Sequence, residues 1–223
     1  MNIAVLGTGM VGRALAGRLD GLGHTVVIGT RDPQATLART EPEGTAPIAA
    51  WLAEHAGITL ATFAEAARGA DLIVNASSGG ATLALLELAG AENLNGKPLL
   101  DIANPLDFSQ GFPPSLFVKD TDSLAEQVQR AFPEVKVVKS LNTLNADLMV
   151  EPKRLGASST IFVSGDDADA KATVVGLLES FGHDDVIDLG ALETARGTEM
   201  LLPIWLRLMG ALGTAQFNFK IVR

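Results

Sequence analysis

Three glycines near the start of the chain have the spacing of a phosphate-binding loop. In the segment AVLGTGMVGRAL, Gly7 directly follows an apolar run, and Gly12 lies within a pattern typical of a helix. Backbone N–H groups at the start of such a helix can hold a pyrophosphate, and glycines allow it to approach closely. We therefore predict that this loop binds a dinucleotide, with the candidate contact residues Gly7, Thr8, Gly9, Met10, Val11 and Gly12.

The end of the second apolar run, VVIGTRD, indicates which dinucleotide is bound. A carboxylate here would accept hydrogen bonds from the adenosine ribose, but Thr30 and Arg31 offer a hydroxyl and a charged guanidinium instead. Asp32 lies about 20 residues beyond Gly12, where a ribose-binding acid is expected. It also precedes Pro33, and this pair is a favourable helix start. We interpret Asp32 as a helix cap and predict that Thr30 and Arg31 bind the extra phosphate of NADP(H).

Polar side chains also occur near three later strand candidates, in the segments NASSGGAT, DIANPLD and KSLNTLN. The carboxyl ends of parallel strands share one edge of a sheet, so these segments are expected to surround the nicotinamide. Ser77, Ser78 and Thr82 can offer hydroxyls to the pyrophosphate or its riboses, although turn and helix capping explain them equally well. Asn104 and Asn142 can each donate to and accept from the nicotinamide amide.

The elements that must position these residues alternate along the chain, as in a parallel sheet joined by helical crossovers. The predicted strands are Ile3–Leu6, Thr25–Ile28, Ile58–Leu60, Asp71–Asn75, Leu99–Ile102, Val135–Val138, Thr160–Val163 and Val186–Leu189. One helix follows the glycine loop, and the others are expected around Ala46–Ala56, Thr62–Arg68, Ala81–Leu88, Ser123–Ala131, Asp167–Phe181 and Leu192–Leu212. The last helix carries Trp205, Leu206, Met209 and Leu212, which we interpret as core residues rather than as part of an acceptor pocket or dimer interface.

Composition restricts the class of protein. The 223 residues are 47% hydrophobic and carry a formal net charge of −9, and they contain no Lys/Arg-rich block, so nucleic acid is not an expected partner. There is no cysteine and the three histidines are scattered, so no metal site is expected. The N-terminus does not have the pattern of a secretion signal, and the most apolar window is interrupted by charged residues and glycines. We expect a cytoplasmic protein without a membrane segment.

Six sequence blocks, in this order, carry a resemblance to a known family. They are AVLGTGMVGRALAGRL, GHTVVIGTRDP, DIANPLD, VVKSLNTLNADLM, VSGDDADAKATVVGLLESFG and VIDLGALETARGTEMLLPIWLRL. They resemble the NADPH-dependent reductases of the deazaflavin coenzyme and the oxidoreductase domain of the STEAP metalloreductases. The resemblance implies a Rossmann-like, doubly wound α/β fold whose mainly parallel sheet is extended by C-terminal strands, and it implies a homodimer. We expect residues 1–140 to form the dinucleotide-binding core and residues 141–223 to extend the same compact unit.

The resemblance also implies hydride transfer between NADP(H) and a deazaflavin coenzyme as co-substrate. An NADPH-dependent flavin or ferric reductase and a non-catalytic NADP(H)-sensing protein are the alternatives. The chain contains no tyrosine, which excludes the tyrosine and lysine pair of many carbonyl reductases. Hydride transfer between two planar rings depends mainly on positioning, so no acid or base is predicted. We interpret Lys139, at a strand end, as a solvated or salt-bridged residue.

Overall fold

The computed structural model describes residues 1–42 and 44–223, and an eight-stranded sheet runs through its centre. The strand order is β10-β9-β8-β5-β4-β1-β2-β3. These strands are β1 (Asn2–Leu6), β2 (Thr25–Thr30), β3 (Ile58–Thr62), β4 (Leu72–Asn75), β5 (Pro98–Asp101), β8 (Lys136–Lys139), β9 (Ile161–Gly165) and β10 (Val186–Asp188). All neighbours pair in parallel except β8 and β9, which are antiparallel. The predicted α/β fold, mainly parallel and extended by C-terminal strands, is confirmed.

Helices cover both faces of the sheet, which explains why its strands are almost continuously apolar. On one face of the sheet, Ile3 and Val5 of β1 belong to a core that includes residues of α1 (Met10–Gly21), α8 (Ala146–Val150) and α9 (Ala168–Phe181). On the other face, Ala4 and Leu6 belong to a core that includes residues of α4 (Phe63–Arg68), α5 (Thr82–Ala89), α6 (Ala91–Leu94) and α7 (Leu124–Ala131). Two apolar cores therefore hold the sheet between two helical layers, in agreement with the doubly wound arrangement.

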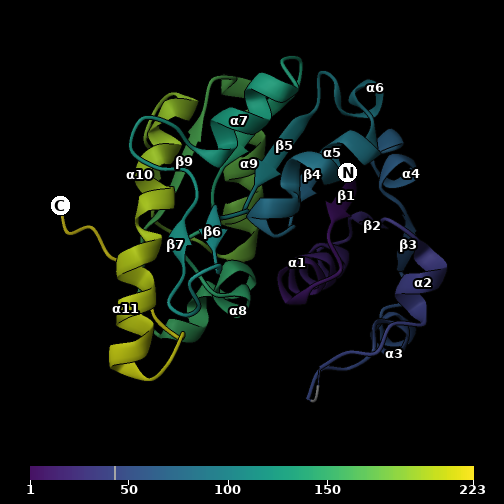
Figure 1. Cartoon of the computed structure of the whole chain (residues 1–223), viewed down its shortest axis with the longest axis horizontal. Coiled ribbons are helices and arrows are strands. Elements are labelled where there is room, and N and C mark those ends of the chain that lie inside the picture. The colour runs from purple at the N-terminus through teal and green to yellow at the C-terminus, as the bar shows by residue number, and fades with distance from the viewer. Residues whose placement is uncertain (43) are drawn as a thin grey trace.

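The remaining helices lie at the two ends of the molecule (Figure 1). Near β3 are α2 (Pro33–Leu37) and α3 (Ile48–Glu54), and at the opposite end are α10 (Ala195–Met200) and α11 (Leu202–Leu212). Short 3-10 turns are η1 (Gly79–Ala81), η2 (Pro152–Leu155) and η3 (Leu192–Thr194). The prediction of one helix over Leu192–Leu212 is wrong. Pro203 lies in the first turn of α11 and has no N–H to continue the ladder from α10, so the chain is interrupted at Leu201.

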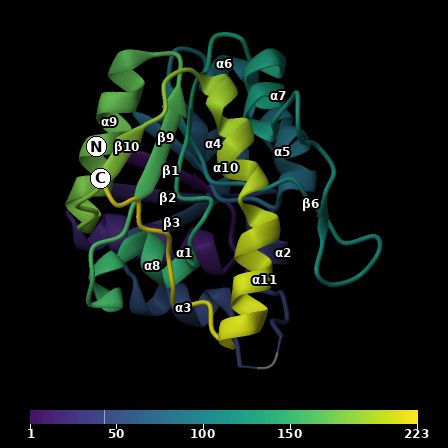
Figure 2. The same cartoon turned by 90° about the vertical axis from the view of Figure 1, so that its left-hand side faces the viewer.

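The segment after β5 contains a small antiparallel hairpin, β6 (Leu106–Asp107) and β7 (Ser115–Leu116). Figure 2 shows the loop between these strands projecting from the body of the molecule. Two exposed aromatic side chains, Phe108 and Phe112, lie on this loop.

Among the residues that the structure describes, no helix has both the length and the apolar character needed to cross a bilayer. The division of the chain at residue 140 stays a prediction.

Candidate functional site

A pocket of about 460 Å³ lies beyond the carboxyl ends of β4, β5 and β8, next to the start of α1. This is the edge at which open parallel sheets bind their ligands. Its lining combines the apolar side chains of α11 with three loops that follow strands. Five predicted site residues line it, namely Val11, Ser77, Ser78, Asn104 and Asn142. The fold thus brings together candidate residues that are far apart in the sequence.

The glycine loop joins β1 to α1, and two of its glycines are required by close packing. A Cβ atom on Gly7 would lie 2.5 Å from the carbonyl oxygen of Ala76, and one on Gly12 would lie 2.1 Å from that of Gly7. Gly7 also has a φ of 137°, a conformation that glycine adopts readily. Gly9, in contrast, has no atom within 4 Å of its Cβ position, and it begins α1 without a side-chain cap. The loop therefore leaves open space in front of the helix N-terminus, as a bound pyrophosphate requires.

The other members of the loop differ in their exposure. Met10 is 77% exposed. Thr8 is buried and held from two sides: Arg39 Nη1 donates to Thr8 Oγ1 at 3.1 Å, and Arg13 Nε donates to Thr8 O at 3.0 Å. Both arginines also donate to Glu41 Oε1. No sequence pattern pointed to Arg13, Arg39 or Glu41, because they come together through an irregular connection after α2.

The end of β2 places Thr30, Arg31 and Asp32 next to the glycine loop, since Gly7 N donates to Gly29 O at 3.2 Å. Asp32 is the N-cap of α2, and its Oδ1 accepts from Ala35 N at 3.0 Å, which confirms the helix-cap interpretation. The hydroxyl of Thr30 is buried and lies 2.7 Å from that of Thr36. Arg31 and Asp32 are both exposed at this strand end, and Arg31 is the cationic one. A phosphate here would thus meet the guanidinium, while the Thr30 hydroxyl fixes α2 against β2.

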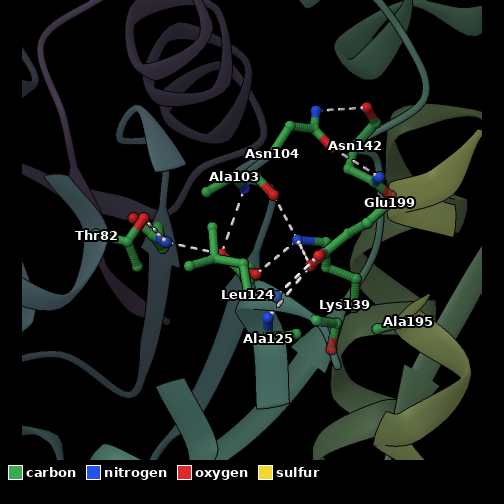
Figure 3. Close-up of polar contacts among 12 residues, drawn as sticks. Thr82, Ala103, Asn104, Leu124, Ala125, Lys139, Asn142, Ala195 and Glu199 are labelled. Atoms are coloured by element: carbon green, nitrogen blue, oxygen red, sulfur yellow. Dashed lines mark hydrogen bonds and ion pairs between the residues drawn. The ribbon is translucent and has the colours of Figure 1, made fainter. Parts of the chain in front are cut away.

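Asn104 and Asn142 bind each other across the floor of the pocket (Figure 3). Asn104 Nδ2 donates to Asn142 O at 2.8 Å, and Asn142 Nδ2 donates to Asn104 Oδ1 at 3.0 Å and to Thr198 O at 3.0 Å. A side-chain amide has two donor hydrogens and one acceptor oxygen. Among the described residues, these contacts leave a hydrogen on Asn104 Nδ2 and the Oδ1 of Asn142 unused. One donor and one acceptor are the complement of a carboxamide.

Thr82 does not line the pocket and is fully buried, so its hydroxyl is not placed to contact a ligand directly. It instead lies 3.0 Å from Ser77 Oγ and accepts from Asn75 Nδ2 at 3.4 Å. Asn75 continues the network, because its Nδ2 donates to Asp101 Oδ1 at 2.7 Å. The position of Ser77 on the pocket wall therefore depends on a buried set of polar side chains behind it.

A buried ion cluster ends this network below the pocket (Figure 3). Lys139 Nζ lies 2.8 Å from Asp101 Oδ2 and 2.8 Å from Glu199 Oε1, and it donates to Ala103 O. All three charged side chains are at most 1% exposed. Burial by itself lowers the pKa of the Lys139 ammonium, but the two neighbouring carboxylates outweigh it and raise that pKa. Lys139 is thus salt-bridged, one of the two predicted alternatives, and stays charged.

Glu199 also fixes the neighbouring helix α7, since its carboxylate accepts from Leu124 N at 2.8 Å and from Ala125 N at 3.2 Å. An anion at a helix N-terminus satisfies free N–H groups and opposes the helix dipole. The cluster therefore ties the C-terminal helices to the sheet at the level of the pocket.

The apolar wall of the pocket corrects one prediction. Of the four α11 residues that we interpreted as core, only Leu206 is buried, and Leu212 is 56% exposed. Trp205 and Leu206 line the pocket, and the Trp205 ring stacks on Phe217 with ring centroids 5.2 Å apart. The spacing of these four residues is that of an apolar helix face. Because α11 lies at one end of the sheet (Figure 1), this face lines the pocket and is partly exposed instead of packing in the core.

The doubly wound sheet, the glycine loop at its switch point and the adjoining pocket define a nucleotide-binding protein of the Rossmann type. Residues 2–105 match the family model described as NADP oxidoreductase coenzyme F420-dependent. The F420-dependent NADP reductase of Methanothermobacter marburgensis is 30% identical, and the match covers 93% of this chain and 92% of that protein. The chain belongs to this family of F420-dependent NADP reductases.

Two further comparisons agree with this assignment. The chain superposes over the full length of both chains, with a TM-score of 0.96 and 63% sequence identity, on a crystal structure of an Arthrobacter sp. FB24 protein provisionally assigned as an F420-dependent NADP-reductase. It is also 31% identical to the metalloreductase STEAP3 of Rattus norvegicus over 92% of this chain, which spans only 38% of that protein. The expected resemblance to both groups is therefore confirmed.

Proposed function

We propose that this chain is an oxidoreductase that transfers a hydride between NADP(H) and the deazaflavin coenzyme F420. The observation that carries the proposal is one pocket whose lining joins Val11 and Ser77, beside the glycine loop, to Trp205 and Leu206 of α11. A nicotinamide at the Asn104 end would leave its ring between the strand ends and this apolar wall. That F420 is the hydride acceptor is inferred from those relatives that are named F420-dependent NADP reductases.

The residues present fit a dinucleotide on observations of this chain alone. Gly9 provides open space in front of α1, and Arg31 is exposed at the end of β2. The amides of Asn104 and Asn142 retain one donor and one acceptor for a carboxamide. When bound, NADPH supplies the hydride, while the chain holds the donor ring at a fixed place and excludes water with apolar side chains.

The lining of the pocket favours a ring acceptor over a carbonyl substrate. None of the described residues that line it carries an ionisable side chain. An aldehyde or ketone would need a proton donor at its oxygen, whereas hydride transfer between two planar rings depends mainly on their mutual positioning. The apolar side chains of Leu144, Met149 and Trp205 offer such a surface, which supports a deazaflavin acceptor.

The direct test is to mix the purified chain with NADPH and oxidised F420 and to follow the absorbance of each. We expect stoichiometric consumption of both. Trp205→Ala should raise KM for F420 while leaving the Kd for NADPH unchanged, because Trp205 lies on the apolar wall away from the glycine loop. Turnover with free flavin or a ferric chelate but not with F420 would indicate the flavin or ferric reductase, and tight NADPH binding without any turnover would indicate a sensor.

We also propose that the chain acts as a homodimer in the cytoplasm, as the resemblance implied. The exposed apolar side chains Phe108, Phe112 and Ile204, on the β6–β7 loop and on α11, support an association at this end of the molecule. Light scattering after size-exclusion chromatography should give twice the mass of one chain, and a mass of one chain would contradict the dimer.

A further inference from the structure

Arg39 lies against the glycine loop although it belongs to the segment after α2. Its Nη1 donates to Thr8 Oγ1 at 3.1 Å and its Nη2 donates to Glu41 Oε1 at 2.7 Å. A guanidinium has five donor hydrogens, so its contacts with the described residues leave others for a ligand. The side chain is 41% exposed, so a solute can reach it. Arg39 is thus a partly free cation fixed in place at the phosphate-binding loop.

Hydrogen bonds connect Arg39 with the end of β2 as well as with the loop. The contacts are Gly7 N to Gly29 O (3.2 Å), Thr30 Oγ1 with Thr36 Oγ1 (2.7 Å), Arg39 N to Thr36 O (3.2 Å) and Arg39 Nη1 to Thr8 Oγ1 (3.1 Å). Together with the chain itself they form a closed ring around the carboxyl end of β2. Arg31 directly follows Thr30 of this ring and is exposed. Arg31 and Arg39 therefore lie at the same strand end, although Arg39 comes from the segment after α2.

The charges in this region do not cancel. Arg13 and Arg39 share one carboxylate, that of Glu41, and Asp32 is occupied as the cap of α2. Hydrogen bonding from Arg39, together with Arg13, lowers the pKa of Glu41, so that its carboxylate is charged. Among the residues that the structure describes in this group, two guanidiniums and one carboxylate leave one positive charge. It belongs to Arg39, because the Arg13 side chain is only 9% exposed and is turned to backbone carbonyls.

We propose that Arg39 is a second binding residue for the 2′-phosphate of NADP(H), acting with Arg31, and is therefore a determinant of cofactor specificity. The inference rests on the NADP(H) binding proposed above. The adenosine ribose of a bound dinucleotide lies beyond the end of the second strand, which is the region that this ring encloses. A phosphate dianion there can accept charge-assisted hydrogen bonds from both guanidiniums. NADH has no group at that position, so Arg39 contributes little to its binding.

The test compares ligands that differ only in this phosphate. NADPH and NADH, and separately adenosine 2′,5′-bisphosphate and adenosine 5′-phosphate, are titrated by calorimetry into the wild type and into Arg39→Ala, Arg39→Gln and Arg31→Ala. The expected result is a loss of affinity for the 2′-phosphorylated ligands of about tenfold or more in each variant, the scale of one charge-assisted contact. The affinity for NADH and for adenosine 5′-phosphate should stay nearly constant. No electron acceptor is needed.

Arg130→Ala is the matched control, since Arg130 of α7 is also an exposed arginine paired with a carboxylate, that of Asp122. It should change none of the affinities. Arg39→Gln keeps a donor for Thr8 while it removes the charge, and thermal unfolding of every variant identifies any loss of fold. If Arg39→Gln lowers NADPH and NADH binding equally, or lowers neither, the proposal is overturned. If Arg31→Ala still lowers the affinity for NADPH but not for NADH, NADP(H) remains the proposed cofactor and only the role of Arg39 is rejected. If the wild type binds NADPH no more tightly than NADH, both the proposed cofactor and the role of Arg39 are rejected.

Discussion

Asn104 and Asn142, from the segments that follow β5 and β8, bind each other by a reciprocal pair of hydrogen bonds of 2.8 and 3.0 Å. Each amide is thereby fixed in one orientation, so the donor and acceptor that remain are held in place before any ligand binds. Preorganised polar groups bind more tightly than mobile ones, because their conformational entropy has already been lost in folding. This relationship supports the proposal that the pair binds the carboxamide of the nicotinamide.

Asn142→Ala should therefore weaken NADPH binding as well as the fold. It removes the partner of Asn104 and leaves the carbonyl of Thr198 without its donor. We expect losses of about 1–3 kcal/mol both in the free energy of unfolding and in that of NADPH binding. Asn93→Ala is the control: Asn93 is also buried and donates to Ala89 O at 2.7 Å, but it lies on α6. Urea unfolding and fluorescence titration with NADPH measure both quantities, and equal Kd values for the two variants would contradict the assignment.

Two glycines of the same loop should respond in opposite ways to substitution by alanine. Gly9 has a φ of −76° and open space around its Cβ position, so Gly9→Ala should fold at least as stably as the wild type but should bind NADPH more weakly. Gly12→Ala places a methyl group 2.1 Å from Gly7 O and should lower the free energy of unfolding by about 1–3 kcal/mol. Thermal unfolding and NADPH titration separate the two effects. Normal NADPH binding by Gly9→Ala would show that no phosphate lies at this helix start.

Lys139→Met should be strongly destabilising, because it leaves Asp101 and Glu199 buried without their cation. Breaking a buried ion pair in this way costs about 3–5 kcal/mol. Lys136→Met is a control on the same strand, where a half-exposed lysine pairs with Asp167 at 3.0 Å, and it should cost no more than about 1 kcal/mol. Urea unfolding of both variants gives the comparison.

The same cluster predicts a pH dependence. Folding raises the pKa of Lys139. Its contribution to the free energy of unfolding is therefore fully present below the pKa of the unfolded chain, about 10.4, and is lost only as the pH rises through the higher pKa of the folded chain. The wild type and Lys139→Met should thus differ in unfolding free energy by the same amount from about pH 6 to 9, as far as this ion pair is concerned. A difference that vanishes within this range would mean that Lys139 is neutral in the folded chain.

Local sequence patterns were sufficient to predict the strands of the sheet and the helix cap at Asp32. Central strands such as β1 and β4 are buried on both faces, so they are apolar along their length and can be located from composition alone. The interpretation of Asp32 as a cap was also local, since the carboxylate and the N–H of Ala35 lie three residues apart. Local reasoning could not decide whether a new helix begins at Pro203, because proline is tolerated in the first turn of a helix but interrupts a helix elsewhere.

The polar architecture of the site was not accessible in this way. Lys139 is fully buried and pairs with two carboxylates from distant parts of the chain, Asp101 and Glu199. No periodicity in the sequence indicates that these three residues meet. The contacts of Arg39 with Thr8 and of Asn104 with Asn142 likewise depend on how irregular segments return to the sheet edge. Sequence spacing could place residues near the carboxyl ends of strands, but it could not tell which of their hydrogen bonds were already satisfied.

The C-terminal tail provides the last prediction, since it is fastened through Asp185 beside β9. Asp185 accepts from Lys220 at 2.7 Å and from Arg223 at 2.8 Å, and the backbone of Phe219 pairs with Thr160 N at 2.9 Å. Hydrogen bonds from Lys220, Thr160 and Arg223 lower the pKa of Asp185 to about 2. Its stabilising contribution is therefore present above the ordinary pKa near 4 and is lost only as the pH falls through about 2.

Hydrogen exchange of residues 217–223, corrected for the intrinsic rate at each pH, should show protection in the wild type at both pH 5 and pH 3. Asp185→Asn should remove this protection at both values. Asp184→Asn should retain it, because among the described residues Asp184 accepts from Ser158 and contacts no tail residue directly. Because Phe217 of the tail stacks on Trp205 in the pocket wall, Asp185→Asn should also raise KM for F420 without changing the Kd for NADPH. Loss of protection in the wild-type tail between pH 5 and pH 3, with the sheet still protected, would show that Asp185 does not hold the tail.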